Sequence, residues 1–220
     1  PPWSSTRHSL SNVRALQKDF QVKLRNVFSF FTIYANIDAW APTLASPPVA
    51  ERPLLDRWIV SELSLTVAEV RAHMDGYGVY EAALRLAAFV ESLSNWYVRR
   101  SRERFWAAGA GESMGTDKRA AYATLHACLL TLAKLSAPFV PFFAEELYQA
   151  LAVAPGLPGA AESVHLEDYP ESDSATIDRS LSEAMAAVRE LTSLGLQVRT
   201  TAKRKVRQPL RRADIVPAQA

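Results

Sequence analysis

The stretch Leu93-Ser-Asn-Trp-Tyr-Val-Arg-Arg-Ser-Arg-Glu-Arg-Phe-Trp106 decides the fold of this 220-residue chain. Neither Gly nor Pro interrupts it, so it predicts a helix that continues from the apolar residues upstream. A helical projection places Leu86, Phe89, Leu93 and Tyr97 on one stripe, which Arg100 and Arg104 continue. The opposite side carries Asn95, Arg99, Arg102 and Trp106. A helix end with arginines on both faces must meet acidic groups, another domain or an anionic polymer.

Helical spacing of apolar residues extends in both directions from this stretch. It predicts helices over residues 13–37, 54–74, 79–108, 117–136, 141–151 and 176–194, with Asp117 as an N-cap. Gly195 is expected to interrupt the last helix, and residues 163–170 alternate as a short extended segment does. Residues 212–216 are expected to begin a strand. The predicted fold class is therefore an all-α helix bundle.

Three parts of the chain differ in character. Residues 1–12 are polar and form a frayed or disordered lead-in, residues 13–194 form the bundle, and residues 195–220 form a basic junction that starts a further domain. The charge is segregated along the chain although the net charge is only +2. Nine acids and one base lie between Glu145 and Glu183, whereas seven bases and no acid lie between Arg199 and Arg212. Such a basic end favours contact with phosphate.

Composition excludes several classes of protein. Hydrophobic residues make up 49% of the chain, enough for a sizeable core. The single cysteine, Cys128, excludes a disulfide framework and a Cys-rich zinc site, and it is expected to be a core thiol in a reducing, cytoplasmic compartment. No apolar run is long enough to span a membrane, and no signal-peptide pattern is present.

Residues that could carry chemistry are scattered. The sequence contains no Gly-rich phosphate loop and no metal-spaced His/Cys cluster, so no catalytic or metal-binding residue is assigned. His126 and His165 are interpreted as packed or surface side chains. Glu145 and Glu146 diverge by 100° on a helix, and at least one is expected to pair with an arginine. Phe139, Phe142 and Phe143 are predicted to lie in the core.

Basic and aromatic clusters are the positive signals. Asn95, Arg99, Arg102 and Trp106 are candidates for RNA contact, with a solvated face or a docking surface for a neighbouring domain as the alternative. Arg100 and Arg104 are expected to form partly buried pairs with Asp56, Glu62 or Glu145. The strongest phosphate candidates are Lys203, Arg204, Lys205 and Arg207, and a weaker group comprises Lys23, Arg25 and Asn26.

Together these segments resemble a known family. Six segments are similar to the anticodon-binding helical domain of isoleucyl-tRNA synthetases of the eukaryote-like branch. They are the opening stretch, Asp56-Arg-Trp-Ile-Val-Ser, Tyr80-Glu-Ala-Ala, Ala137-Pro-Phe-Val-Pro-Phe, Ala144-Glu-Glu-Leu-Tyr148 and Ser163-Val-His-Leu-Glu-Asp-Tyr-Pro170. Lys205-Val-Arg-Gln-Pro-Leu210 resembles the element that follows that bundle. The resemblance covers nearly everything from Asn26 onward. It implies the helix bundle of class I synthetases and a binding partner, isoleucine tRNA.

The chain also departs from the family's full pattern. The class I catalytic signatures His-Ile-Gly-His and Lys-Met-Ser-Lys-Ser are absent, as are an editing domain and a zinc motif. The resemblance therefore implies an excised fragment that binds the anticodon stem and loop and is inactive alone. In the full enzyme, ATP and Mg²⁺ would be used by a catalytic domain that is a further partner of this piece.

Two other functions remain open on the sequence. The Asp-Arg-Trp-Ile and Ala-Pro-Phe patterns are shared with valyl-tRNA synthetases, so the chain is also compatible with the corresponding domain of that enzyme. A helical protein-interaction module, whose arginine face docks an acidic partner, is the second alternative.

Overall fold

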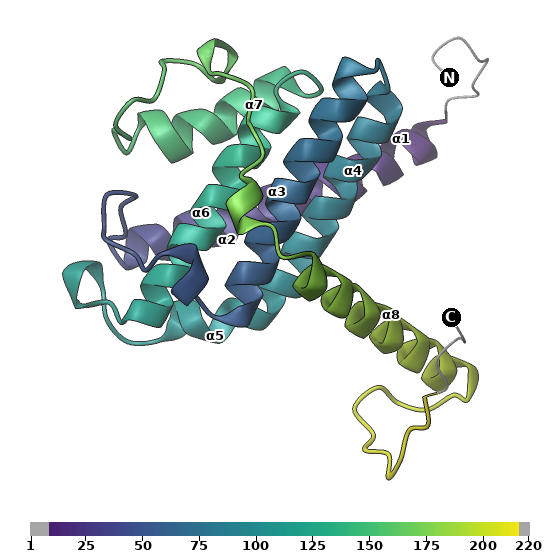
Figure 1. Ribbon diagram of the computed structural model, residues 1–220. Helices are drawn as coiled ribbons and strands as arrows, with labels where there is room; N and C mark the ends of the chain where they lie inside the picture. Colours follow the sequence, from purple (N-terminus) through teal and green to yellow (C-terminus); the bar gives the residue numbers. More distant parts are fainter. Residues whose placement is uncertain (1–8, 216–220) are drawn as a thin grey trace. The chain divides into compact units, whose positions relative to one another are not determined.

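A computed structural model describes residues 9–215, and every regular element in that range is helical (Figure 1). The predicted all-α fold is confirmed. The chain divides into two compact units, Pro1–Asp178 and Arg179–Ala220. Across the described residues, none of the helices is both long enough and apolar enough to cross a membrane.

The first unit begins with one long helical run. α1 (Leu10–Gln17) continues through a π turn, Lys18–Val22, into α2 (Lys23–Ile37). The run starts at Leu10 rather than at the predicted Val13, because residues 10–12 contain neither Gly nor Pro to stop it. The rest of the predicted lead-in, residues 1–8, lies outside the described residues. The buried side of α2 has helical spacing, with Leu24, Val27, Phe31 and Ala35.

α3 (Leu54–Asp75) and α4 (Val79–Ser92) form an antiparallel pair that lies side by side in Figure 1. Pro53 stands immediately before α3, where its fixed φ and missing N–H do not disturb a helix. The short turn after α3 is closed by the Gly78 N–H, which donates to the His73 carbonyl at 2.7 Å. The second predicted helix therefore matches α3 to within a residue at its end.

α4 does not stop at Ser92. A π turn, Leu93–Val98, joins it to α5 (Arg99–Trp106), so the predicted helix over residues 79–108 is present but contains a π turn in its middle. α5 ends at Trp106 because Ala107 is extended, with ψ of 152°.

α6 (Thr116–Ser136) is the central helix of the first unit and packs against α2, α3, α5 and α7. Its N-cap is Gly115 rather than the predicted Asp117, whose carboxylate binds Arg104 instead. Cys128 is fully buried in α6, which confirms the expected core thiol.

α7 (Pro141–Tyr148) follows and runs on through a π turn, Gln149–Val153. The prediction of three core phenylalanines is wrong for Phe142, which is 91% exposed. Phe139 precedes the helix, so helical spacing does not relate the three rings.

Residues 163–170 are not extended as predicted. They contain a 3₁₀ turn, Val164–Leu166, because Glu145 accepts hydrogen bonds from the Val164 N–H at 2.9 Å and from Ser163 Oγ at 3.0 Å. Hydrogen bonds from Lys134 and Tyr148 hold Glu167, at the end of this turn, in place. Other 3₁₀ turns occur at Val49–Glu51 and Gly111–Ser113, and the last one, Ser174–Thr176, closes the first unit.

The second unit consists of α8 (Arg179–Thr201) and an irregular segment to residue 215. Gly195 does not interrupt α8, because one glycine inside a helix costs only about 1 kcal/mol. The two compact units meet at residue 178, before α8, and the further domain expected to start at residue 195 stays a prediction. The strand expected from Arg212 does not begin within the described part, and residues 216–220 lie outside it.

Candidate nucleic-acid interface

The π turn Leu93–Val98 determines which face of α5 reaches solvent. Such a turn bonds residue i to residue i+5 and so holds one more residue than an α turn. The stripe upstream is buried as predicted, at Leu86, Phe89, Leu93 and Tyr97. At the end of the turn and in α5, the buried positions are Val98, Ser101 and Phe105. Arg100, which a uniform projection assigned to the buried stripe, is thereby displaced from it and is exposed.

The four predicted outward residues all lie on the exposed side of this helix. Asn95, Arg99 and Arg102 are exposed, and Trp106 is 57% exposed although its ring is large and apolar. The Asn95 amide donates to Glu91 at 3.0 Å. Arg99 and Arg102 have no ion-pair partner among residues 9–215. Two unpaired guanidinium groups and an exposed indole therefore share one helical face.

Arg100 joins this outward group, which corrects its assignment to a buried ion pair. It is exposed, and its guanidinium lies over the Trp96 ring at 4.5 Å from the ring centroid. The acids proposed for it have other partners: Glu62 pairs with Arg85 at 3.6 Å, and Glu145 holds the Val164 turn. A cation over an aromatic face is a geometry that also suits a stacked base.

Arg104 forms the buried pair that the sequence predicted. Its Nη1 and Nη2 donate to the two carboxylate oxygens of Asp56 on α3, and Asp56 is fully buried. The Tyr97 hydroxyl donates to the same carboxylate at 2.7 Å, and Arg104 Nε donates to Asp117 at 3.0 Å. Arg104 therefore anchors α5 and is not available to an external anion.

The loop after α5 is fixed by a second buried carboxylate. Asp38, after α2, accepts a hydrogen bond from Tyr122 and pairs with Lys118 at 2.7 Å. Lys118 also donates to the carbonyls of Ala107 and Gly109, at 2.7 and 3.0 Å. The Gly111 N–H donates to the Asp38 carbonyl at 2.7 Å. These bonds join the end of α5 to the end of α2.

The candidates on α2 are largely engaged within the chain. Arg25 donates two hydrogen bonds of 2.8 Å to Glu146 on α7 and lies 5.0 Å over the Phe143 ring. The hydrogen bonds from Arg25 lower the pKa of Glu146, and they confirm that one of the paired glutamates meets an arginine. Lys23 approaches Asp19 at 3.6 Å, and Asn26 is exposed. This group offers an external ligand less free charge than α5 does.

The basic candidates of the second unit surround the end of α8. Lys203 has φ of 51° and occupies the left-handed position after the helix, where glycine is usual. The helix is closed there by two hydrogen bonds, from Lys203 N to the Thr200 carbonyl at 3.0 Å and from Arg204 N to the Arg199 carbonyl at 2.8 Å. Lys203, Arg204, Lys205 and Arg207 are all exposed.

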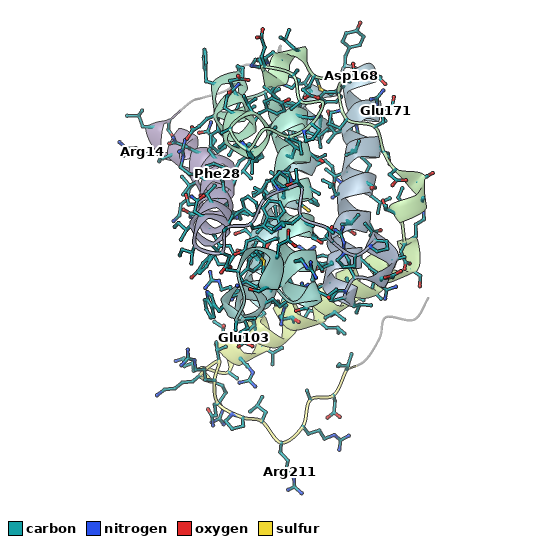
Figure 2. The ribbon with its side chains drawn as sticks, turned by 90° about the vertical axis from the view of Figure 1, so that its left-hand side faces the viewer. Arg14, Phe28, Glu103, Asp168, Glu171 and Arg211 are labelled. Atoms are coloured by element: carbon teal, nitrogen blue, oxygen red, sulfur yellow. The ribbon has the colours of Figure 1, made fainter. Side chains whose placement is uncertain are left out.

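Arg199 has a role that the sequence did not indicate. Its Nη1 donates to the carbonyls of Lys205, Val206 and Gln208, at 3.1, 3.2 and 2.8 Å. These bonds fold residues 205–208 back toward the end of α8. The basic segment is therefore a shaped loop, while Arg211 projects from the chain beyond it (Figure 2).

Acidic residues gather at the other end of the first unit. Asp168 and Glu171 lie at the end opposite Glu103 of α5 in Figure 2. Near them, hydrogen bonds from Lys134 and Tyr148 lower the pKa of Glu167 to about 2. The outward arginines of α5 are thus well separated from this acidic end, which leaves their positive field less compensated.

Comparison with known proteins matches this chain to one family. Residues 56–214 match the family described as the anticodon-binding domain of tRNA ligase. The match begins at the buried Asp56 and includes α5 and the basic loop after α8.

Individual relatives cover nearly the whole chain. An isoleucine–tRNA ligase of Dehalococcoides mccartyi is 45% identical over 220 residues, which is all of this chain and 21% of that protein. The isoleucine–tRNA ligases of Streptomyces coelicolor and Deinococcus radiodurans are 42% and 44% identical over 99% and 95% of this chain, and over 20% and 18% of their own lengths. The chain thus spans about a fifth of the length of these relatives.

Proposed function

Because the chain belongs to the anticodon-binding domain family of tRNA ligases, we propose that it binds the anticodon stem and loop of isoleucine tRNA. The relatives named above are all isoleucine–tRNA ligases, which supports isoleucine tRNA over valine tRNA as the ligand. In this proposal the chain supplies recognition, and the chemistry belongs to other parts of a longer enzyme.

The observation that carries the proposal is the exposed face of α5. Arg99 and Arg102 form no ion pair with a described acid, and Trp106 and the Arg100–Trp96 pair offer flat surfaces beside them. Guanidinium groups bind phosphate oxygens, and aromatic rings stack on unpaired bases. Asn95 on the same face adds a side-chain amide for hydrogen bonding.

The basic loop after α8 is the second proposed contact. Lys203, Arg204, Lys205 and Arg207 are exposed, and Arg199 shapes the loop that carries two of them. Phosphate contacts of this kind contribute affinity without reading sequence. Lys23 and Asn26 on α2 would be peripheral contacts, whereas Arg25 would first have to leave Glu146.

For the longer protein, we propose the activity named in its relatives, isoleucine–tRNA ligation. ATP and Mg²⁺ would act in a catalytic domain outside these residues, in the cytoplasm. No residue of this chain is assigned to hold either of them, because the sequence has no Gly-rich phosphate loop and none of the catalytic signatures.

A binding titration tests the proposal directly. The purified chain is titrated against labelled isoleucine tRNA, valine tRNA and isoleucine tRNA with an altered anticodon, at several salt concentrations. We expect the tightest binding to unaltered isoleucine tRNA and an affinity that falls with salt. Equal affinity for all three RNAs would contradict the proposed specificity. No binding at low salt would contradict RNA binding itself and would favour a protein-docking role for the arginine face.

A further inference from the structure

We propose that a hollow between α2, the segment that follows it, α6 and the π turn Gln149–Val153 holds one unpaired base of the bound anticodon loop, an inference that rests on the proposed function. The hollow has a volume of about 270 Å³. Its lining includes the aromatic rings of Phe31, Trp40 and His126 and the polar side chains of Thr32 and Asn36. None of the lining residues is Lys, Arg, Asp or Glu, so the site suits a neutral planar group and not a phosphate.

The rings form a rigid apolar wall. Trp40 stacks on Tyr122, with ring centroids 5.7 Å apart and an angle of 19° between the planes, and Tyr122 is fully buried. Phe31 and His126 lie 5.5 and 5.1 Å from the Trp40 ring. Trp40 itself is only partly buried, and it lines the hollow. A stacked aromatic with one open side is the kind of platform on which proteins place unpaired bases.

A strained backbone holds Trp40 in this position. Ala39 has φ of 50°, in the left-handed region that side chains other than glycine seldom adopt. The turn is closed by the Trp40 N–H, which donates to the Ala35 carbonyl at 2.9 Å, and so returns the indole toward α2. Such strain persists where the surroundings fix it, and it is common beside binding sites.

The His126 imidazole contributes a neutral face. Its Nε2 lies 2.9 Å from the Leu151 carbonyl, which occupies that nitrogen and fixes the ring. Burial lowers the pKa of His126, so at neutral pH the ring adds no charge to the wall. A base that stacks on the His126 ring would therefore do so without a positive charge on the ring.

Asn36 supplies the polar edge that base recognition needs. It is exposed at the end of α2, and within residues 9–215 its side-chain amide has no hydrogen-bond partner. Thr32, by contrast, already donates to the Phe28 and Ser29 carbonyls. The side-chain amide of asparagine presents a donor and an acceptor together. Adenine carries the matching acceptor and donor on one edge, and asparagine binds that edge in other nucleic-acid complexes.

Size and position agree with a single base. At about 30 Å³ per water molecule, the hollow equals roughly nine waters, less than the usual range of about 300–1,000 Å³ for ligand pockets. The hydrogen bonds of Asp38 to Tyr122, Lys118 and Gly111 place the rim of the hollow beside the loop that follows Trp106. In this proposal, a strand held on the α5 arginines places one of its bases in the hollow.

The inference is tested by coupling between protein and RNA changes. Affinities are measured for the chain and its Asn36→Ala variant with anticodon-arm hairpins, intact or made abasic at one loop position at a time. We expect Asn36→Ala to weaken binding of the intact hairpin about tenfold, and to have no further effect on the one hairpin that lacks the bound base. Trp40→Phe, which keeps an aromatic ring, is expected to show the same coupling with a smaller loss.

Ile37→Ala is the matched control, because Ile37 is the exposed neighbour of Asn36 and does not line the hollow. It should leave every affinity unchanged. If Asn36→Ala weakens all hairpins equally, or none, the hollow does not hold a base although the chain binds the RNA. If the unaltered chain binds no hairpin at all, the proposed function fails, and this inference fails with it.

Discussion

Arg104 on α5 and Asp56 on α3 share two hydrogen bonds, of 2.6 and 2.8 Å, with the carboxylate fully buried. The Tyr97 hydroxyl donates a further hydrogen bond to that carboxylate. This pair separates the arginines of α5 into two kinds: one that is part of the folded structure and three that face solvent.

Breaking the Arg104–Asp56 pair is expected to destabilise the first unit. Asp56→Ala leaves the partly buried guanidinium without its main partner, and losses of about 3–5 kcal/mol are typical of such changes. At roughly 2–4 °C per kcal/mol, the midpoint of thermal unfolding should fall by about 6–20 °C. The exposed Arg102→Met is the control and should change stability by less than about 0.5 kcal/mol. An equal effect of the two substitutions would show that the pair does not hold α5.

Relief of strain at Ala39 is expected to stabilise the fold. Ala39→Gly removes the Cβ from a residue with φ of 50°, and this should raise the free energy of unfolding by about 0.5–1 kcal/mol. Ala110→Gly is the comparison, since Ala110 lies in an exposed loop with φ of −138° and gains nothing from glycine there. Urea unfolding of both variants measures the difference. If Ala39→Gly is no more stable than Ala110→Gly, the backbone at Ala39 is not strained.

Protonation of Glu167 at low pH should lower the free energy of unfolding. Hydrogen bonds from Lys134 and Tyr148 lower the pKa of this carboxyl from 4.5 to about 2, so its contribution is complete above 4.5 and is lost as the pH falls toward 2. At 1.36 kcal/mol per pKa unit, the contribution at neutral pH is about 3 kcal/mol. Glu167→Gln should therefore be less stable than the parent chain at pH 7, with a difference that shrinks as the pH approaches 2. A difference independent of pH would exclude this ionisation as the cause.

The outward arginines should each contribute one phosphate contact. Arg99→Ala and Arg102→Ala are each expected to reduce the slope of log K against log salt by about 0.7–0.9. Arg14→Ala removes the same charge from α1, away from Glu103 and α5 in Figure 2, and should leave the slope unchanged. Titrations at four or more salt concentrations give the slopes. Equal slopes for all three variants would assign the effect to net charge alone.

Substitutions in the loop after α8 should distinguish the residues that contact phosphate from the residue that holds the loop in shape. Lys205→Ala and Arg207→Ala are expected to weaken tRNA binding and to flatten its salt dependence, because each removes an exposed positive charge. Arg199→Met removes the donor to three loop carbonyls, so it should weaken binding while leaving the slope nearly unchanged. Arg199 would belong to the phosphate contacts if its substitution flattened the slope as well.

Apolar spacing predicted most of the fold, because the long helices of the first unit bury apolar residues at helical spacing. The stripe of Leu86, Phe89, Leu93 and Tyr97 is an example, and it is buried as the pattern requires. The pattern placed Arg100 wrongly because a helical projection assumes 100° per residue throughout, and a π turn has no signature in composition. The helix-breaking effect of glycine was also overestimated, because α8 continues through Gly195 to Thr201.

The candidate site was predicted in part. The exposure of Asn95, Arg99, Arg102 and Trp106 agrees with the sequence, while their role in binding tRNA stays a prediction. The ion pair of Arg25 with Glu146 joins residues 121 positions apart, and no local pattern reveals such a partner. The aromatic hollow around Trp40 was missed for the same reason, since its rings come from three separate segments.

The π turn Leu93–Val98 also determines how α5 would respond to a change in residue count. The turn holds one residue more than an α turn, so removing one residue from it would leave a regular helix with nearly the same rotation across the segment. Arg100 would stay outward, and Arg104 would stay on Asp56. Removing one residue between the turn and Arg104 would instead rotate Arg104 by about 100°, away from Asp56. A lineage can therefore lose one codon within the turn and keep this surface, whereas loss of one codon just after the turn displaces the anchor of the helix.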